Sequence, residues 1–383
     1  MKPTFVTLFP VAQNVHLIKD VGQVANTMAA LGECDAKLVC YKNSESYRLQ
    51  TTEANHLQLE FLEPCGRLLF MEKAILNYLK KNAKQITVLH LFHLTKETIY
   101  YALYYKKWNP AGKIYIKMDV YNEMLEEGIR YSKKGLFNWV HQQKANQFFR
   151  KLTAISAENP TSVALLKQNY PLLRDKAFLL TNGVNNEFLA AHFSQPKKLS
   201  EKENIILSVG RIGAKDKNYE MLLNSFVKAG TKNWQLVLVG PIENAFDEKV
   251  KRAIEKNPHL EGKIILTGAI EDRIELYEQY NRSKIFCLTS PFESFGIAFV
   301  EAMYFGNYIV GTTGMSSFDY ISNHSDLGSK VAVNDEEALT LLLKKLMSNT
   351  VILEETYPKA QQQVTEKFYW SEIIKNLKIA LAQ

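Results

Sequence analysis

The sequence predicts an α/β protein built from two doubly wound parallel-sheet domains. Short apolar runs typical of buried strands alternate with segments of helical periodicity along most of the chain. This alternation forms two series, and a polar, lysine-rich stretch at 190–203 separates them. A chain of 383 residues is also longer than a typical single core, and it suits two domains of about 190 residues each.

The first series predicts a domain at 1–190. Its apolar runs are typical of strands, at 5–9, 36–41, 57–62, 86–92, 113–118 and 178–180. Apolar residues at helical spacing predict helices at 23–30 and 67–80. Residues 10–22 are predicted to form a loop after the first strand.

The second series predicts a domain at 200–365. Its expected strands are at 204–209, 234–239, 263–266, 285–289, 308–311 and 330–333. Its expected helices are at 219–229, 247–255, 274–281 and 297–305, the last ended by Gly306 as a cap. Residues 366–383 predict a further amphipathic helix.

Composition and charge narrow the classes of partner. The chain is 46% apolar and 23% charged, as in ordinary globular proteins, and its net charge is +7. Residues 1–185 hold 24 Lys and Arg against 15 Asp and Glu, so the first domain is the basic one. This favours an anionic partner such as a lipid surface or a phosphate-linked acceptor, and a merely lysine-rich solvated surface is the alternative. No nucleic-acid-binding module is recognisable, so nucleic acid is not expected.

The remaining bulk features favour a cytoplasmic protein. Four cysteines are scattered without a CxxC pair and are expected to be reduced thiols. No signal-peptide pattern and no membrane-spanning run is present. The segment at 130–140 mixes Arg130, Lys133 and Lys134 with Phe137 and Trp139, which would suit peripheral contact with the anionic inner face of the cell membrane. An ordinary surface helix is the alternative.

Residues 283–314 predict a strand, a polar loop, a helix and a second strand. In such a sheet a ligand binds at the carboxyl ends of the strands. Glu293 lies in the loop, and the backbone N–H groups of Phe295, Gly296 and Ile297 open the helix, where a phosphate can bind. Glu301 can accept hydrogen bonds from two vicinal hydroxyls of a ribose. These parts suit a nucleotide-sugar site, whereas a helix-capping Glu293 with a solvated Glu301 is the alternative.

A second group of candidate residues follows the strand at 204–209. Gly210 and Arg211 stand at its carboxyl end, and Lys217 lies just before the next helix. Two cations here could hold a diphosphate and stabilise the charge on a leaving nucleoside diphosphate. Lys215 competes with Lys217 for this role, and a solvated basic turn is the alternative.

The string SPFESFGIAFVEAMYFGNYIVGTTG closely resembles the nucleotide-sugar motif of glycosyltransferase family 4, with its Glu-x7-Glu spacing. Gly210-Arg211-Ile212 and Lys217-Asn218 resemble that family's Gly-Arg-Leu and Lys-Asn pattern. The resemblance implies the GT-B architecture: two Rossmann-like domains facing across a cleft, with residues 366–383 packing back on the first domain. It also implies a donor site on the second domain, in which Ser294 belongs to the loop and the backbone of Gly268 and Ile270 holds the base.

The resemblance also suggests acceptor residues in the first domain, where the match is weaker. The family's loop after the first strand faces the cleft, and here it carries His16, Lys19, Asp20 and Gly22 in place of the usual Gly-Gly pair. Asp20 would orient an acceptor hydroxyl or, alternatively, cap the following helix.

Three other places in the first domain invite a functional interpretation. Lys117 and Asp119 end the strand at 113–118 where many family members have a His, and a strand-end ion pair is the alternative. His90 and His93 are expected to be core histidines and not a metal pair. The turn at 181–185 resembles the family's interdomain turn, and a positional role is expected for it.

The resemblance implies a retaining glycosyltransferase that needs no metal or other cofactor. The donor would be a nucleotide-sugar, expected to be UDP-linked, and the acceptor a glycan or a lipid-linked glycan of a bacterial surface polysaccharide or glycoconjugate. The residues expected to act in catalysis are Glu293, Asp119, Arg211 and Lys217. Two other functions fit the same fold: a catalytically silent partner or glycan-binding chain, and a nucleotide-sugar epimerase.

Overall fold

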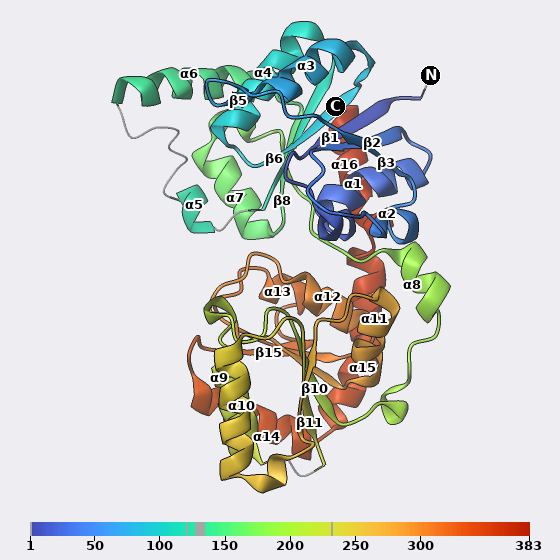
Figure 1. Cartoon of the computed structure of the whole chain (residues 1–383), viewed down its shortest axis with the longest axis vertical. Helices are drawn as coiled ribbons and strands as arrows, with labels where there is room; N and C mark the ends of the chain where they lie inside the picture. Colours follow the sequence, from blue (N-terminus) through green and yellow to red (C-terminus); the bar gives the residue numbers. More distant parts are fainter. Residues whose placement is uncertain (1, 120–121, 127–134, 231–232) are drawn as a thin grey trace. The chain divides into compact units, whose positions relative to one another are not determined.

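The computed structural model describes residues 2–119, 122–126, 135–230 and 233–383 (Figure 1). The chain forms two compact units. Unit 1 comprises Met1–Phe188 together with Tyr369–Gln383, and unit 2 comprises Leu189–Phe368. The passage from one unit to the other lies beside the polar stretch that the sequence favours as a domain boundary.

Unit 1 is organised on a seven-stranded parallel sheet with the strand order β3-β2-β1-β6-β7-β8-β9. Strand order reverses between β1 and β6, which is the topological switch point of a doubly wound sheet. The strands are β1 (Thr4–Leu8), β2 (Asp35–Cys40), β3 (Leu57–Phe61), β6 (Val88–Phe92), β7 (Lys113–Met118), β8 (Ala154–Ala157) and β9 (Ala177–Leu179). A separate antiparallel hairpin pairs β4 (Arg67–Leu68) with β5 (Met71–Glu72).

Helices pack on the sheet of unit 1, and several begin at clear sequence signals. Asn159 accepts a hydrogen bond from Ser162 N ahead of Pro160, and Thr95 accepts one from Thr98 N. The helices are α1 (Asp20–Ala30), α2 (Leu49–Thr52), α3 (Lys73–Asn82), α4 (Lys96–Trp108), α5 (Asn122–Glu126), α6 (Gly135–Lys151), α7 (Pro160–Asn169) and α16 (Trp370–Ala382), with 3-10 turns η1 (Asn14–Ile18), η2 (Ala83–Gln85) and η3 (Pro171–Leu173). Helix α8 (Asn186–Phe193) spans the passage into unit 2.

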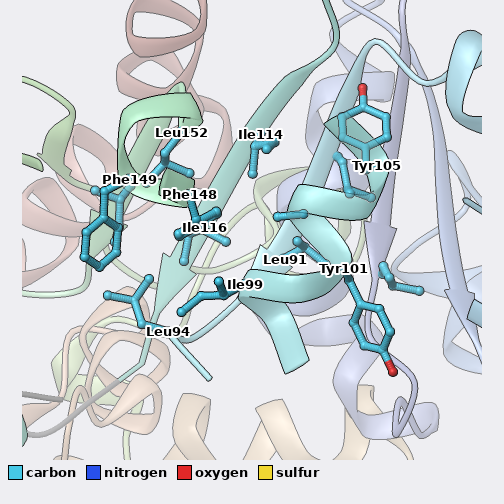
Figure 2. Close-up of a cluster of buried hydrophobic side chains, with 14 of the residues drawn as sticks. Leu91, Leu94, Ile99, Tyr101, Tyr105, Ile114, Ile116, Phe148, Phe149 and Leu152 are labelled. Carbon is cyan, nitrogen blue, oxygen red and sulfur yellow. The ribbon is translucent and has the colours of Figure 1, made fainter. Parts of the chain in front are cut away.

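The two faces of this sheet bury different apolar clusters. Figure 2 shows one of them: Leu91, Ile114 and Ile116 from the strands lie against residues of α4 and α6 such as Ile99 and Phe148. On the other cluster α16 lies beside α1 (Figure 1), and it buries Trp370, Ile374 and Leu377. The last helix of the chain therefore packs on the first unit, next to helix α1.

Unit 2 repeats the plan with a six-stranded parallel sheet in the order β12-β11-β10-β13-β14-β15. Its switch point lies between β10 and β13. The strands are β10 (Ile205–Val209), β11 (Gln235–Val239), β12 (Ile264–Gly268), β13 (Ile285–Cys287), β14 (Tyr308–Thr312) and β15 (Gly328–Val331). The helices are α9 (Tyr219–Ala229), α10 (Asn244–Lys256), α11 (Arg273–Arg282), α12 (Ile297–Tyr304), α13 (Phe318–Ile321), α14 (Glu336–Ser348) and α15 (Val351–Lys367), with 3-10 turns η4 (Leu199–Glu201), η5 (Lys215–Lys217) and η6 (Pro258–Leu260).

The predicted fold class is confirmed: the chain is an α/β protein with two Rossmann-like doubly wound parallel sheets. Local predictions failed in three places. The helix predicted from residue 67 begins at Lys73, and the hairpin β4–β5 occupies its expected first residues. Strand β8 was not predicted, because its four residues are too short to show a periodicity. The predicted loop 10–22 contains η1 and the start of α1.

A buried lysine supports unit 2 at the start of β10. Lys202 is 4% exposed, although it belongs to the stretch that composition marks as a polar linker. Its ammonium donates to the carbonyl oxygens of Tyr280 (3.2 Å) and Ser283 (2.8 Å) at the end of α11, and to Asn307 Oδ1 (2.9 Å). Burial holds the pKa of Lys202 well below its usual value. The side chain joins the end of α11 to the turn between α12 and β14.

We expect Lys202→Met to lower the free energy of unfolding by about 2 kcal/mol, because three acceptors lose a buried donor while the volume is retained. Urea denaturation followed by tryptophan fluorescence measures the loss. The exposed neighbour in Lys198→Met is the matched control, with an expected change within about 0.5 kcal/mol. Equal stability of the two variants would contradict a supporting role for Lys202.

Candidate active site

Three glycines stand at the carboxyl ends of adjacent strands in unit 2. Gly210 follows β10, Gly240 follows β11, and Gly268 ends β12. At Gly240 the backbone has a φ of +140°, and a Cβ would lie 1.8 Å from the carbonyl oxygen of Gly210. The ends of β10 and β11 can approach each other this closely only because Gly240 carries no side chain, whereas a Cβ at Gly268 would meet nothing within 4 Å. The three glycines leave the backbone at this edge open to a ligand.

The loop from β10 to α9 carries the predicted cations. Arg211 is exposed, and its guanidinium pairs with Asp216 at 2.6 Å. Lys217 ends η5 and is held in place because Thr289 Oγ1 donates to its carbonyl oxygen at 3.2 Å. Lys215, the competing candidate, is exposed on the same turn. The structure thus brings Lys217 to the end of β13.

Lys217 forms an ion pair with Glu293. The ammonium lies 2.6 Å from Glu293 Oε2, and the two side chains are 21% and 22% exposed. The loop that bears Glu293 is fixed by its neighbour after β14: Ser316 N donates to Glu293 O at 3.2 Å, and Ser317 Oγ donates to Ser294 O at 2.7 Å. Residues 76 positions apart therefore meet as a charged pair beside the switch point.

Helix α12 begins directly after this loop. Gly296 is its N-cap with a φ of +80°, a left-handed conformation that glycine adopts without strain. Phe295 is buried against Phe368, which holds the start of the helix in place. The first two N–H groups of α12, those of Ile297 and Ala298, precede any helical acceptor and carry the positive end of the helix dipole, whereas Phe299 N donates to Gly296 O at 2.9 Å. The start of the helix therefore suits an anion.

Glu301 is not a solvated helix residue. It is 8% exposed, and three side chains of α11 donate to its carboxylate: Arg273 to Oε1 at 3.0 Å, Tyr277 to Oε1 at 3.3 Å and Tyr280 to Oε2 at 2.9 Å. Burial, and secondarily the negative charge of Glu301, raises the pKa of the Tyr280 hydroxyl well above its usual value. Glu301 Oε2 keeps a lone pair for a further donor, such as a hydroxyl.

The opposite face of α11 lines a separate cavity of about 480 Å³. Ile270 and Ala269 border it together with Glu275, Gln279 and Arg282. Ile270 thus borders the cavity on the face of α11 opposite to the one that contacts Glu301. A contact of Ile270 with a base through its backbone, as the resemblance implies, remains a prediction.

In unit 1 the predicted acceptor residues separate into buried and exposed ones. Lys117 is fully buried, and its ammonium lies 3.0 Å from Asp20 Oδ2 and 2.8 Å from Glu158 Oε1. It also donates to Asn182 Oδ1 at 3.0 Å. Lys117 therefore cannot touch an acceptor directly, and its expected role is corrected: it fixes the start of α1 to β7 and to the turn after β9.

Asp20 neither caps α1 nor faces solvent freely. It is the first residue of the helix and is 8% exposed; Lys117 holds one of its carboxylate oxygens, and Val21 N donates to the other at 2.9 Å. Gly22 is buried within α1, and a Cβ there would lie 2.3 Å from Leu17 O. Its missing side chain serves the packing of η1 on α1, so direct contact of Gly22 with an acceptor is also corrected.

His16, Lys19 and Asp119 lie nearer to solvent. His16 Nδ1 accepts from Gln13 N at 2.9 Å, and its ring lies against Phe9. Burial, and secondarily Lys19, lowers the pKa of His16. Lys19 and Asp119 are exposed, Asp119 directly after β7. These three stay candidates for contact with an acceptor.

The buried group of Lys117, Asp20 and Glu158 combines one cation with two carboxylates. Burial raises the pKa of Glu158 to about 8, with Asp119 and Asp20 adding to the rise and Lys117 opposing it. Burial alone would lower the pKa of Lys117, but Asp20 and Glu158 outweigh it and raise it. Burial therefore favours the protonated form of Glu158, while the two neighbouring carboxylates favour the charged form of Lys117.

His90 is a core histidine, as expected. Its Nδ1 lies 3.0 Å from Thr7 Oγ1, and burial lowers its pKa to about 3, so the ring is neutral. His93 lies at the end of β6 with a φ of +57°. Among the described residues, no group of three or more His, Cys, Asp and Glu side chains could hold a metal ion.

The sequence analysis missed several supporting residues. Arg273 and Tyr280 give no signal, because contacts between two helices leave no local pattern. Ser316 and Ser317 lie in the small-residue segment that follows β14, and Glu158 follows a strand that was not predicted. One sequence signal could have identified Glu158, because it is a charged residue directly after a short buried strand.

The suggested membrane-contact segment is only partly described. Arg130, Lys133 and Lys134 lie outside the described residues, and Trp139 is 60% exposed on α6. In the described part of the chain, no helix is both long and apolar enough to cross a membrane.

Replacing Glu158 by Gln is expected to flatten the pH dependence of stability. The pKa of this carboxyl rises from 4.5 to about 8 on folding. Between those values the folded state holds the extra proton, so the free energy of unfolding falls as pH rises. From pH 5 to 8, wild type should lose more stability than Glu158→Gln, by more than about 1 kcal/mol.

Urea denaturation at several pH values measures this difference. The exposed Glu45→Gln is the control and should keep the wild-type slope. A wild-type slope in Glu158→Gln would mean that Glu158 is already ionised in the folded protein.

A family model matches most of unit 2, and several curated proteins are similar to this chain in sequence. Residues 191–366 match the family model described as "Glycosyl transferases group 1". Over 210 residues the chain is 29% identical to a probable sucrose-phosphate synthase of Thermosipho melanesiensis, covering 54% of this chain and 47% of the relative. It is 27% identical over 191 residues to a Campylobacter jejuni α-1,4-N-acetyl-D-galactosaminyltransferase that acts on a diNAcBac-PP-undecaprenol-linked glycan, covering 47% of this chain and 50% of the relative. The chain thus spans about half the length of these curated relatives.

Solved structures resemble the whole chain. A glycosyltransferase of Rickettsia africae superposes with a TM-score of 0.71 at 20% identity, covering 99% of this chain and 98% of the other. Anabaena Alr3699/HepE, solved with UDP and glucose, superposes with a TM-score of 0.72 at 14% identity and 99% coverage of both chains. These similarities establish the fold, which is that of GT-B glycosyltransferases. Residues 191–366, which make up most of unit 2, are thus similar to the glycosyl transferases group 1.

Proposed function

We propose that this chain is a glycosyltransferase of family 4 that moves a sugar from a UDP-sugar to an acceptor hydroxyl with retention of configuration. The observation that carries the proposal is the arrangement around the start of α12. Glu293 and Glu301 flank an anion-binding helix N-terminus, and Lys217 contacts Glu293 beside it. The UDP and glucose bound by the Anabaena protein of the same fold support a nucleotide-sugar donor.

In this proposal the donor binds unit 2 through its charged and hydroxyl groups. The N–H groups at the start of α12 and the side chains of Arg211 and Lys217 hold the diphosphate. A phosphate replaces Glu293 as partner of Lys217, which frees the Glu293 carboxylate to accept from a sugar hydroxyl. Glu301, already oriented by Arg273 and Tyr280, accepts from the ribose.

The chemical step then depends on the departing UDP. Negative charge develops on its outer phosphate as the glycosidic bond breaks, and the cations and N–H groups stabilise that charge. The departing phosphate oxygen takes the proton of the attacking hydroxyl. No metal is expected to be needed, and turnover in the presence of EDTA checks this.

The acceptor is proposed to bind unit 1, with Asp119 orienting its hydroxyl. A glycan or lipid-linked glycan of a bacterial cell-surface pathway suits the basic character of residues 1–185. The undecaprenol-linked acceptor of the Campylobacter relative supports this setting. The protein is then expected to work in the cytoplasm, at the inner face of the membrane.

Thermal stabilisation by a panel of nucleotide-sugars without acceptor tests the donor site. One UDP-sugar should raise the melting temperature by a few degrees at saturating concentration. Glu301→Gln should weaken its binding at least about tenfold, because a charge-assisted hydrogen bond becomes a neutral one. The exposed Glu248→Gln is the matched control and should bind like wild type.

The same panel separates the rival functions. Conversion of a UDP-sugar to its epimer without acceptor would identify an epimerase of this fold. Failure of every nucleotide-sugar to stabilise the protein would instead favour a catalytically silent, glycan-binding chain.

Arg211→Ala should lower kcat/KM about 10- to 100-fold, because one charge-assisted contact to the diphosphate is lost. Arg211 is largely exposed and pairs only with the exposed Asp216 in the described contacts, so the fold should be unaffected. Arg252→Ala removes an exposed arginine of α10 and serves as the control. Unchanged turnover in Arg211→Ala would remove this residue from the site.

A further inference from the structure

Unit 1 contains a cavity of about 450 Å³ that takes no part in the proposed donor site. It lies where β1 and β6 end, at the switch point of the sheet, which is the usual place for a ligand in a doubly wound fold. Leu8 and Phe9 border it from β1, Leu91 and Phe92 from β6, and Tyr101 from α4. Figure 2 shows Leu91 and Tyr101 on adjacent elements.

The lining combines an apolar interior with a polar margin. Leu8, Ile75, Leu91 and Phe92 are all buried and contribute no polar side-chain atom. The polar residues that border the cavity include Arg67 and Glu72 of the hairpin, Glu97 of α4, and His93 and Thr95 between β6 and α4. Arg67 and Glu72 neutralise each other as an ion pair at 2.6 Å. The interior therefore favours an uncharged, apolar group.

The hairpin β4–β5 forms one wall and is firmly attached to unit 1. Glu72 N donates to Tyr101 Oη at 2.8 Å, and the ring of Phe70 lies edge-on to Tyr100. The ammonium of Lys96 lies 3.8 Å from the centre of the Phe70 ring. The wall is therefore a fixed part of the cavity.

Large apolar side chains are exposed beside residues that line the cavity, because Leu68 and Leu69 stand between Arg67 and Phe70 in the chain. Leu68 and Leu69 of the hairpin are 51% and 83% exposed, and Val11, which borders the cavity, is 64% exposed. Leu69 also has a φ of +58°, a conformation in which Gly, Asn or Asp would be less strained than leucine. A leucine at such a turn contributes apolar surface at a conformational cost, as expected of a binding site.

We propose that this cavity holds a hydrocarbon group of the acceptor, so that the acceptor is a lipid-bearing or alkyl-bearing molecule and not a free sugar or polysaccharide. This rests on the proposed transfer function and names the class of its acceptor. The hydrocarbon occupies the apolar interior and the exposed surface of Leu68, Leu69 and Val11. The polar part lies at the margin formed by Arg67, His93 and Thr95.

Sugar alone suits this cavity poorly. Each hydroxyl of a bare sugar needs a hydrogen-bond partner. Leu8, Ile75, Leu91 and Phe92 offer none, and the buried hydroxyls of Thr98 and Tyr101, which also border the cavity, already bond to Phe92 O and Glu72 N. A hydrocarbon needs no partner and gains from each methylene that leaves water. Because Arg67 and Glu72 neutralise each other, this pair gives the cavity no net positive charge that would attract an anion.

Binding of an alkyl β-glucoside series tests the proposal without any donor. Hexyl, heptyl and octyl β-glucoside, each below its micelle concentration, are titrated calorimetrically against the full chain, with glucose as the reference. Affinity should rise about fourfold for each added methylene, because about that factor accompanies its burial. Glucose should show no binding in the same range.

Two rim variants locate the site. Leu69→Asp and Val11→Asp should weaken octyl glucoside binding at least tenfold, and Asp tolerates the backbone of residue 69 better than leucine does. Leu31→Asp and Leu172→Asp are matched controls, because these leucines of unit 1 are 45% and 39% exposed and do not border the cavity. Both controls should bind as wild type does.

Affinity that does not depend on chain length, or rim variants that bind as tightly as the controls, would overturn the proposal. If the rim variants lose binding to lipid vesicles while the length series stays flat, the leucines contact a bilayer and the cavity holds no hydrocarbon. The donor panel is independent of this series. If the protein responds to a UDP-sugar but binds no alkyl glucoside, this inference alone is refuted. If it binds alkyl glucosides but responds to no nucleotide-sugar, the proposed function is refuted.

Discussion

Parallel strand pairing is the constraint on which both candidate binding regions depend. In a parallel sheet all carboxyl ends lie on one edge, and every loop that follows a strand is brought to that edge. In unit 2 this edge carries Gly210, Gly240 and Gly268, and the ends of β10 and β11 approach each other closely because Gly240 carries no side chain. The loops of Lys217 and Glu293 then meet beside the neighbouring strand β13, although 76 positions separate them in the chain.

Buried lysines hold the connections of both sheets in shape. Lys117 joins α1, β7 and the turn after β9 through Asp20, Glu158 and Asn182, and Lys202 joins the end of α11 to the turn before β14. A buried charge is costly without partners, and removing one partner of a buried ion pair such as those of Lys117 costs about 3–5 kcal/mol. Each network therefore specifies one arrangement of the loops that it connects. Arg273 and Tyr280 orient Glu301 in the same way.

The two units present different chemistry at corresponding edges. Unit 2 offers charged groups and the start of a helix, which suit a phosphate and hydroxyls. Unit 1 offers an apolar cavity with a polar margin, and its cation Lys117 is enclosed. The same fold thus presents polar groups at the edge of one sheet and an apolar cavity at the edge of the other, because the loops and not the strands determine the surface.

The sequence by itself determined the fold class, and it predicted the candidate residues of unit 2 that lie within one strand–loop–helix segment. Short apolar runs and helical spacing are local signals, and Glu293, Gly296 and Glu301 stand within a few turns of one another in the chain. The hairpin at 67–72 could not be predicted from periodicity, because its strands have two residues each and its conformation depends on contacts with α4.

Tertiary structure alone decided burial and partnership. Lysine is usually a surface residue, yet Lys117 and Lys202 are both enclosed, because their partners come from distant segments of the chain. Gly22 supports the packing of η1 on α1, which depends on a close backbone approach that no local pattern shows. The cavity between β1, β6 and the hairpin likewise exists only once those three segments have met, since no one of them encloses it.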